Sequence, residues 1–178
     1  QREMTDCSLP HRHHLLVEFV SSGPGGLPGN QVILHTFWGG RVNRPYAMAL
    51  DAAWDDRFGQ QLELYPADDC IVLMLPHEVE AEEILSLVAS ADVQPLVEKR
   101  LESAGVFGAR FRECADRALL LSRTHMGKRM PLWVSRLRSQ KLLDAVRRYE
   151  DFPILLETWR SCLQDEFDLE ALHRVLAE

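Results

Sequence analysis

The sequence lacks the motifs that mark the commonest catalytic and nucleotide-binding sites. It contains no G-x-x-x-x-G-K-[ST] loop, no G-x-S-x-G elbow and no H-E-x-x-H pair, so it predicts no nucleoside-triphosphate, serine-hydrolase or zincin site. It has four cysteines and no C-x-x-C pair, which argues against structural zinc or a disulfide framework and favours reduced thiols in the cytoplasm. We therefore expect no catalytic residue, no metal and no cofactor in this chain.

Long apolar runs are also missing. None approaches the ~20 residues that a membrane span needs, so we expect no contact with a membrane. The chain starts at Gln1, without Met or a signal-like segment, and this suggests a part cut from a longer protein.

Two polar patterns resemble metal or acid–base sites. The segment HRHH (11–14) and the paired carboxylates at 55–56 and 68–69 bring together side chains that bind cations elsewhere. No further Cys, His or Asp accompanies them at ligand spacing, so we interpret both as solvated polar segments.

Positive charge is scarce overall but concentrated. The net charge is −7, yet residues 107–148 hold eleven Lys and Arg against only three acids, Glu113, Asp116 and Asp144. Such a split predicts a basic surface on an acidic body, which can face a phosphate backbone although the total charge is negative.

The first half of the sequence indicates a small sheet with one inserted helix. Apolar, β-branched segments predict strands at 13–22, 31–38, 61–68 and 70–76. The helix between them is expected at 44–58, with Asn43 as its N-cap and Gly59 as its stop. Its apolar positions recur every four residues, at Tyr46, Leu50, Trp54 and Phe58.

The second half reads as helical. We expect helices at 78–90, 92–104, 106–123 and 131–138, another starting at Ser139, and two more at 152–167 and 168–178, with a basic loop at 124–130. The predicted fold class is therefore α+β, a small antiparallel sheet with an inserted helix followed by a helical bundle. We place the β-rich half at residues 1–77 and the α-helical half at 78–178, together forming one accessory domain.

The strand-to-helix junction 38–46 is a candidate anion site. Gly39 and Gly40 allow close approach of a bulky group, and Arg41, Asn43 and Arg44 stand where a helix start exposes N–H groups that favour phosphate. An exposed Trp38 would add a platform on which a base stacks. The alternative is that Trp38 belongs to the core and the glycines form only a tight turn.

Two basic clusters in the second half are further candidates. Arg110 and Arg117 are seven residues apart and share a helix face, whereas Arg112 lies on another side and is a candidate for pairing with an acid inside the domain. Basic residues flanking an aromatic ring at 123–141 fit single-strand binding, and the residues that we predict to contact nucleic acid there are Lys128, Arg129, Trp133, Arg136 and Arg138. The alternative for both clusters is a charged, solvated surface.

The blocks "GGRVNRPYAMAL", "SAGVFGARFRECADRALLLSR" and "KRMPLWVSRLRSQKLLDAVRRYEDFPILLETWRSCLQDEFDLEAL" resemble the DEAD/H-associated domain of the large helicase-related (Lhr) family. The resemblance covers roughly residues 12 to 177. It implies a parent protein that is a superfamily 2, ATP-dependent helicase moving 3′ to 5′ on single strands in the cytoplasm, with a role in DNA repair.

The resemblance also implies partners. RecA-like and winged-helix domains of the same polypeptide would precede this domain, and ATP and Mg would bind there rather than here. We thus expect a non-catalytic domain that binds the single-stranded DNA or RNA tracking strand. The alternative is a structural module that docks on the helicase core without touching nucleic acid.

Overall fold

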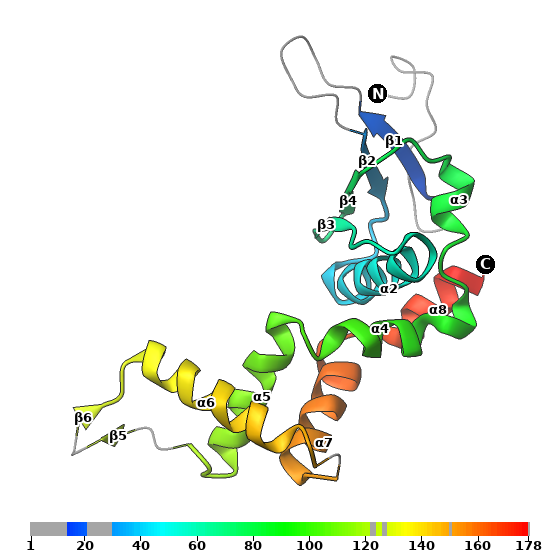
Figure 1. The fold of residues 1–178 in the computed structure, drawn as a ribbon. Coiled ribbons are helices and arrows are strands. Elements are labelled where there is room, and N and C mark those ends of the chain that lie inside the picture. The colour runs from blue at the N-terminus through cyan, green and yellow to red at the C-terminus, as the bar shows by residue number, and fades with distance from the viewer. Residues whose placement is uncertain (1–13, 21–29, 122–123, 126–127, 150, 178) are drawn as a thin grey trace, which may run out of the picture. The chain divides into compact units, whose positions relative to one another are not determined.

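The computed structural model describes residues 14–20, 30–121, 124–125, 128–149 and 151–177. Contacts between residues divide the chain into two compact units (Figure 1). Unit 1 comprises Gln1–Arg100 and Phe167–Glu178, and unit 2 comprises Leu101–Glu166. No helix in the described residues is both long enough and apolar enough to cross a membrane.

Unit 1 is built on a four-stranded antiparallel sheet, which confirms the α+β fold class. The strands are β1 (Leu16–Val20), β2 (Asn30–His35), β3 (Glu63–Pro66) and β4 (Cys70–Leu75), in the spatial order β1-β2-β4-β3. Every neighbouring pair is antiparallel. Side chains alternate between the two faces, so Val32, Leu34, Ile71 and Leu73 are buried on one of them.

The inserted helix α2 (Gly40–Phe58) supplies the other side of this core. Tyr46, Leu50 and Trp54 are fully buried, as their spacing predicts. Gly59 ends the helix in the left-handed conformation with φ of 70°, which confirms the predicted stop. The predicted N-cap is wrong, because the helix begins one turn earlier with Gly39 at the cap position.

Helices from both ends of the second half complete unit 1. They are α3 (Ala81–Leu85), a 3-10 turn (Ser90–Asp92), α4 (Val93–Leu101) and the C-terminal α8 (Leu169–Ala177). The backbone N–H of Asp168 donates to the carbonyl of Arg41 at 3.0 Å, and Ser90 Oγ donates to the carbonyl of His173. Contacts thus group the chain differently from the sequence division at residue 77, because α3, α4 and α8 belong with the sheet.

Unit 2 is helical. Its elements are α5 (Gly105–Arg117), the two short strands β5 (Thr124–His125) and β6 (Lys128–Arg129), α6 (Leu132–Val146), α7 (Pro153–Arg160) and a π-helix (Ser161–Glu166). Helix α5 packs on both α6 and α7. Its Phe107 meets Trp159 of α7 edge to face, with ring centroids 4.9 Å apart.

Two local predictions for unit 2 are wrong. The basic loop expected at 124–130 contains the antiparallel pair β5–β6. The expected break at Ser139 does not occur, since α6 runs through it. Ser139 is buried and its hydroxyl donates to the carbonyl of Arg136 three residues earlier. A serine inside a helix can bond to the preceding turn in this way, although serine is more often found at the N-cap.

Helix α5 ends in an unusual way. Leu119 adopts φ of 59° and is 88% exposed. The N–H groups of Leu119 and Leu120 bond back to the carbonyls of Asp116 and Ala115, the arrangement of a Schellman cap in which glycine is the usual residue.

We expect Leu119→Gly to stabilise the protein by about 1 kcal/mol, because glycine adopts the left-handed conformation without the steric cost of a Cβ. Thermal unfolding should show a melting temperature raised by about 2–4 °C. Ala118→Gly is the matched control: Ala118 has φ of −80°, so glycine there should lower the melting temperature. A lower melting temperature for Leu119→Gly would contradict the assignment.

Candidate nucleic-acid interface

The junction between β2 and α2 is held by the turn between β3 and β4. The N–H groups of Thr36 and Phe37 donate to the carbonyl of Asp69, and that of Gly39 donates to the carbonyl of Asp68 at 2.9 Å. This network fixes the start of α2 against the neighbouring turn.

Asn43 is part of that network and does not face a ligand. It is completely buried. Its Oδ1 accepts from the hydroxyl of Thr36 at 2.8 Å, and its Nδ2 donates to the carbonyls of Ala67 and Asp68 at 2.8 and 3.1 Å. The structure therefore assigns Asn43 to holding the junction together, and we withdraw it from the predicted phosphate site.

The two aromatic residues of the junction, Phe37 and Trp38, differ in exposure. Trp38 is half-buried, with its ring centroid 5.7 Å from that of Tyr46, so it packs in part on the core. Phe37 beside it is 57% exposed at φ of 53°. Phe37 was not among the predicted candidates, because nothing in the sequence pattern signals a left-handed phenylalanine.

A carboxylate already lies beside the arginines of the junction. Arg41 and Arg44 are exposed at the start of α2. However, a Cβ at Gly40 would lie 2.5 Å from Asp68 Oδ1 and 3.3 Å from the guanidinium of Arg44, so a carboxylate already lies beside the helix start. An acidic group there satisfies the positive end of the helix dipole itself.

In unit 2, Arg110 serves the fold. Its guanidinium pairs with Glu113, 2.8 Å away, and with Glu166 of the π-helix. The hydrogen bond to Glu166 is the main cause that raises the pKa of Arg110 above its usual value. The pair joins α5 to the π-helix across 56 residues of sequence, so Arg110 makes the kind of pair inside the domain that the sequence suggested for Arg112.

Other arginines of unit 2 are also occupied. Arg117 donates to Cys114 Sγ at 3.2 Å. Arg147 pairs with Glu102 and Asp144 at 3.0 and 3.5 Å, and Arg148 lies over the ring of Tyr149. These interactions reduce the charge that the basic segment offers to a partner.

The side chains of four cations in unit 2 have no ion pair, hydrogen bond or ring contact with another described residue. They are Arg112, Arg136, Arg138 and Lys141. Trp133 at the start of α6 is 69% exposed, which fits the predicted stacking platform. Lys128 and Arg129 form β6, and their side chains lie outside the described part of the chain.

Helix α6 places these residues on two different faces. Trp133, Arg136 and Gln140 follow at intervals of three and four residues and share one face. Arg138 and Lys141 are about 140–200° away from Arg136 around the axis, at 3.6 residues per turn. Arg136 is one turn from Trp133 on this face, whereas Arg138 lies about 140° from Trp133 around the axis and Lys141, about 80° away, lies eight residues further along the helix.

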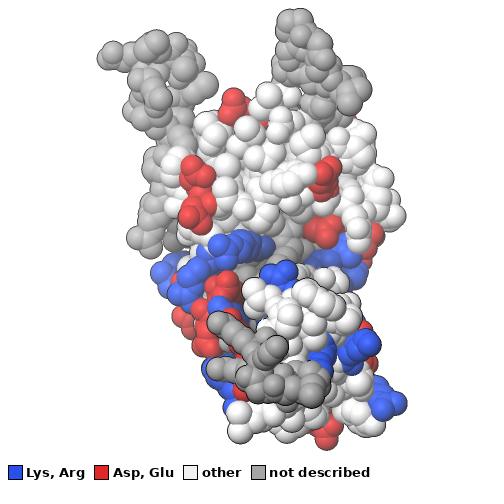
Figure 2. Space-filling model, turned by 90° about the vertical axis from the view of Figure 1, so that its left-hand side faces the viewer, with Lys and Arg blue, Asp and Glu red and all other residues white. Residues whose placement is uncertain are grey.

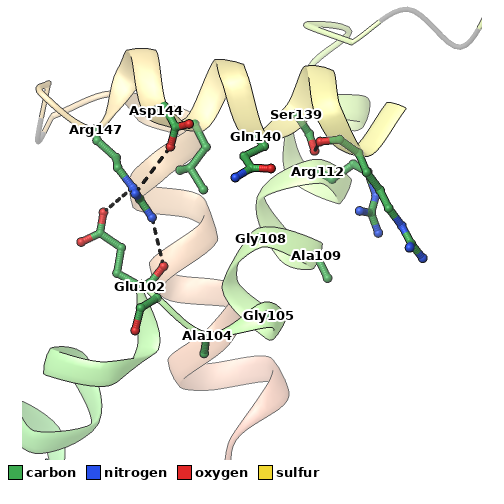
Figure 3. Close-up of a pocket in the computed structure, with 13 residues that line it drawn as sticks. Glu102, Ala104, Gly105, Gly108, Ala109, Arg112, Ser139, Gln140, Asp144 and Arg147 are labelled. Carbon is green, nitrogen blue, oxygen red and sulfur yellow. Dashed lines mark hydrogen bonds and ion pairs between the residues drawn. The ribbon is translucent and has the colours of Figure 1, made fainter. Parts of the chain in front are cut away.

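Arg136 and Gln140 also line a groove between α5 and α6, with a volume of about 410 Å³ (Figure 3). Arg112 of α5 lies at one end of it, near Ser139, and Arg147 with its two acids lies at the other. We use the name α6 face for Trp133, Arg136 and Gln140 of α6 together with Arg112 of α5, which lines the same groove. It collects an exposed ring, two arginines and an amide within one unit.

The paired carboxylates at 55–56 are engaged by basic side chains. Asp55 and Asp56 pair separately with Arg100 and Lys99, and no group of three or more His, Cys, Asp or Glu side chains in the described ranges could hold a metal ion. Burial raises the pKa of the Cys162 thiol to about 11, so this thiol stays protonated at neutral pH. His11 and His13 lie outside the described residues.

Comparison with known proteins decides the family. Residues 9–178 match the family described as DEAD/H associated. The chain belongs to this family. It is 44% identical over 144 residues to the "Lhr helicase/ probable uracil glycosylase" of Mycolicibacterium smegmatis and 36% identical over 170 residues to the "Lhr helicase/uracil glycosylase" of Escherichia coli.

The DEAD/H-associated chain corresponds to a part of these relatives. The matches cover 80% and 94% of the chain but 10% and 11% of the M. smegmatis and E. coli proteins. Among solved structures it is similar, with a TM-score of 0.76 and 41% identity, to the M. smegmatis helicase Lhr bound to ssDNA and AMP-PNP; the likeness covers 84% of this chain and 19% of that one. The predicted resemblance is thus confirmed.

The predicted contact residues of the DEAD/H-associated domain are divided between its two units. Trp38, Arg41 and Arg44 belong to unit 1, and the remaining predicted residues belong to unit 2. On the face shown in Figure 2, Lys and Arg side chains form separate patches among uncharged and acidic surface.

Proposed function

We propose that this DEAD/H-associated domain binds a single-stranded nucleic acid through the α6 face. The observation that carries the proposal is the exposed Trp133 on the same helix face as Arg136, with Arg112 across the groove and no acid pairing either arginine among the described residues. A ring that stacks on bases and cations that contact phosphates are the two parts of sequence-tolerant strand binding.

The proposal extends to the whole protein. The parent is an Lhr-type, ATP-dependent 3′–5′ helicase of the cytoplasm that acts in DNA repair. Its RecA-like and winged-helix domains bind ATP and Mg, and this domain contacts the tracking strand beside them. Support comes from the Lhr names of the relatives and from the ssDNA in the similar structure.

The direct test is a titration of the chain with fluorescent oligo(dT) and oligo(rU), read by anisotropy. We expect weak binding whose log–log salt slope is about −0.7 for each phosphate neutralised on a single strand. The two strands distinguish a DNA partner from an RNA partner. An affinity that is the same at about 50 and 200 mM salt would contradict the proposal.

Trp133→Ala should weaken the binding of both oligo(dT) and oligo(rU) roughly tenfold, because a base stacked on an aromatic ring contributes about 1–3 kcal/mol. Trp133→Phe keeps a ring and should retain most of the affinity. Since Trp133 is exposed, the melting temperature should not change in either variant. Equal affinities of Trp133→Ala and the unsubstituted chain would remove Trp133 from the interface.

The docking alternative also has an observation in its favour. On the outer face of the sheet, Ile33, Val72 and Tyr65 stand opposite one another in register across β2, β4 and β3. Tyr65 is 55% exposed, and Met74 nearby is 36% exposed. Salt-resistant association with separately produced RecA-like and winged-helix domains, abolished in Tyr65→Lys, with no binding of either strand, would favour this second function.

A further inference from the structure

The groove between α5 and α6 has two walls of different character. The α6 wall is polar, with Arg136, Ser139 and Gln140 along it. The α5 wall consists of small residues followed by one arginine, in the order Gly105, Gly108, Ala109 and Arg112. These four stand at positions i, i+3, i+4 and i+7, so they form one side of the helix and leave its backbone accessible (Figure 3).

The fold of unit 2 does not account for the glycine at position 108. A Cβ there would meet nothing within 4 Å, and the same holds at Gly105. Neither glycine has a positive φ. Glycine inside a helix lowers its stability relative to alanine, so at Gly108 the chain gives up helix stability and leaves open space at the groove floor.

The two ends of the groove differ in charge. At one end Arg147 is neutralised by Glu102 and Asp144, as the dashed lines in Figure 3 show. At the other end lies Arg112, and Arg136 is three residues before Ser139 on the same end of α6. The end with two arginines is the one that attracts an anion.

The lining also limits what the anion can be. No aromatic residue is among the groove-lining side chains of the described residues, so the groove offers no stacking surface for a base. A slim, polar, negatively charged chain suits a floor of glycine and alanine beside two arginines. The ring of Trp133, on the same α6 face as Arg136, lies outside the lining.

We infer that this groove holds the sugar–phosphate backbone of the bound strand, with a phosphate between Arg112 and Arg136 and the bases directed out toward Trp133. The inference rests on the proposed function and adds to it a specific channel and an orientation of the strand. Gly108 acts as a positioning residue that lets the backbone approach α5.

The test fills the groove in the full 178-residue chain. Gly108→Ala and Gly108→Leu are compared with Ala145→Leu, an exposed position of α6 that does not line the groove. The probes are oligo(dT), oligo(rU) and an abasic deoxyribose-phosphate strand, which keeps the phosphates but has no bases.

We expect Gly108→Leu to weaken the binding of all three probes by about tenfold or more and Ala145→Leu to leave it unchanged. Gly108→Ala should raise the melting temperature by about 2–4 °C, as alanine favours the helix, and still weaken binding. A higher melting temperature together with a lower affinity in Gly108→Ala keeps the test decisive even if Gly108→Leu folds poorly. Trp133→Ala should weaken the binding of only the two strands that carry bases.

Three results would overturn the inference. If the Gly108 variants bind like the unsubstituted chain while Arg112 and Arg136 variants do not, the strand lies elsewhere on the α6 face and the proposed function stands. If Gly108 variants bind oligo(dT) more weakly but bind the abasic strand normally, the groove holds a base instead. If the unsubstituted chain binds none of the probes, the proposed function fails and the channel with it.

Discussion

The double variant Arg112→Glu/Arg136→Glu should bind single strands about a hundredfold more weakly than the unsubstituted chain. Each reversal removes one cation that neutralises a phosphate and adds a repelling carboxylate, and a tenfold reduction for each corresponds to about 1.4 kcal/mol. The log–log salt slope should also become shallower, by about 0.7 for each phosphate that the variant no longer neutralises. Fluorescence anisotropy at several salt concentrations measures both quantities.

The matched control is Arg138→Glu/Lys141→Glu. It changes the net charge by the same amount within unit 2, but both residues lie on the side of α6 away from Arg136. If binding depends on the α6 face, this control loses only the long-range attraction, which falls within a Debye length of about 8–10 Å. Equal reductions of affinity in the two double variants would show that net charge alone, and no defined face, governs binding.

The parts of the fold that sequence predicts well are those set by local periodicity. The four-residue spacing of Tyr46, Leu50 and Trp54 determines one buried side of α2, and Gly59 ends the helix because glycine adopts a left-handed conformation readily. Neither feature depends on where the rest of the chain lies. Short apolar, β-branched segments predict the strands of the sheet for the same reason.

The candidate site was predicted less well, because its residues depend on partners far away in sequence. Arg110 pairs with Glu166, which is 56 residues away. From helix spacing alone, Arg110 and Arg117 share a face and look available, whereas Arg112 looks internal. Only the position of the π-helix shows that Arg110 is the arginine used inside unit 2 and that Arg112 opens onto the groove.

The start of α2 shows the same limit. Asparagine is a preferred N-cap residue type, but the Nδ2 of Asn43 donates to the carbonyls of Ala67 and Asp68 in the turn between β3 and β4. A sequence pattern cannot distinguish a side chain that caps its own helix from one that anchors the helix to a distant turn. Trp133 was easier to recognise, because an aromatic ring among cations has few uses in a core.

Asn43→Leu should produce the largest loss of stability among the substitutions considered, about 3–4 kcal/mol. It removes three hydrogen bonds and leaves the carbonyl of Ala67 without its donor, whereas the carbonyl of Asp68 keeps the N–H of Gly39. An unsatisfied buried group costs about 1–3 kcal/mol, and each further lost hydrogen bond costs about 1 kcal/mol. Urea unfolding should show a lower midpoint with an unchanged slope.

Thr36→Val provides a graded control, because it removes only the hydroxyl that donates to Asn43 Oδ1 and should cost about 1 kcal/mol. A binding measurement on the Asn43 variant distinguishes a structural role of Asn43 from the phosphate contact that its sequence position predicts. At a temperature where Asn43→Leu is still folded, it should bind oligo(dT) as tightly as the unsubstituted chain, since the buried amide touches no ligand. A folded Asn43→Leu variant with a reduced salt slope would instead show that a phosphate binds at the start of α2, and the α6 face would then be only part of the interface.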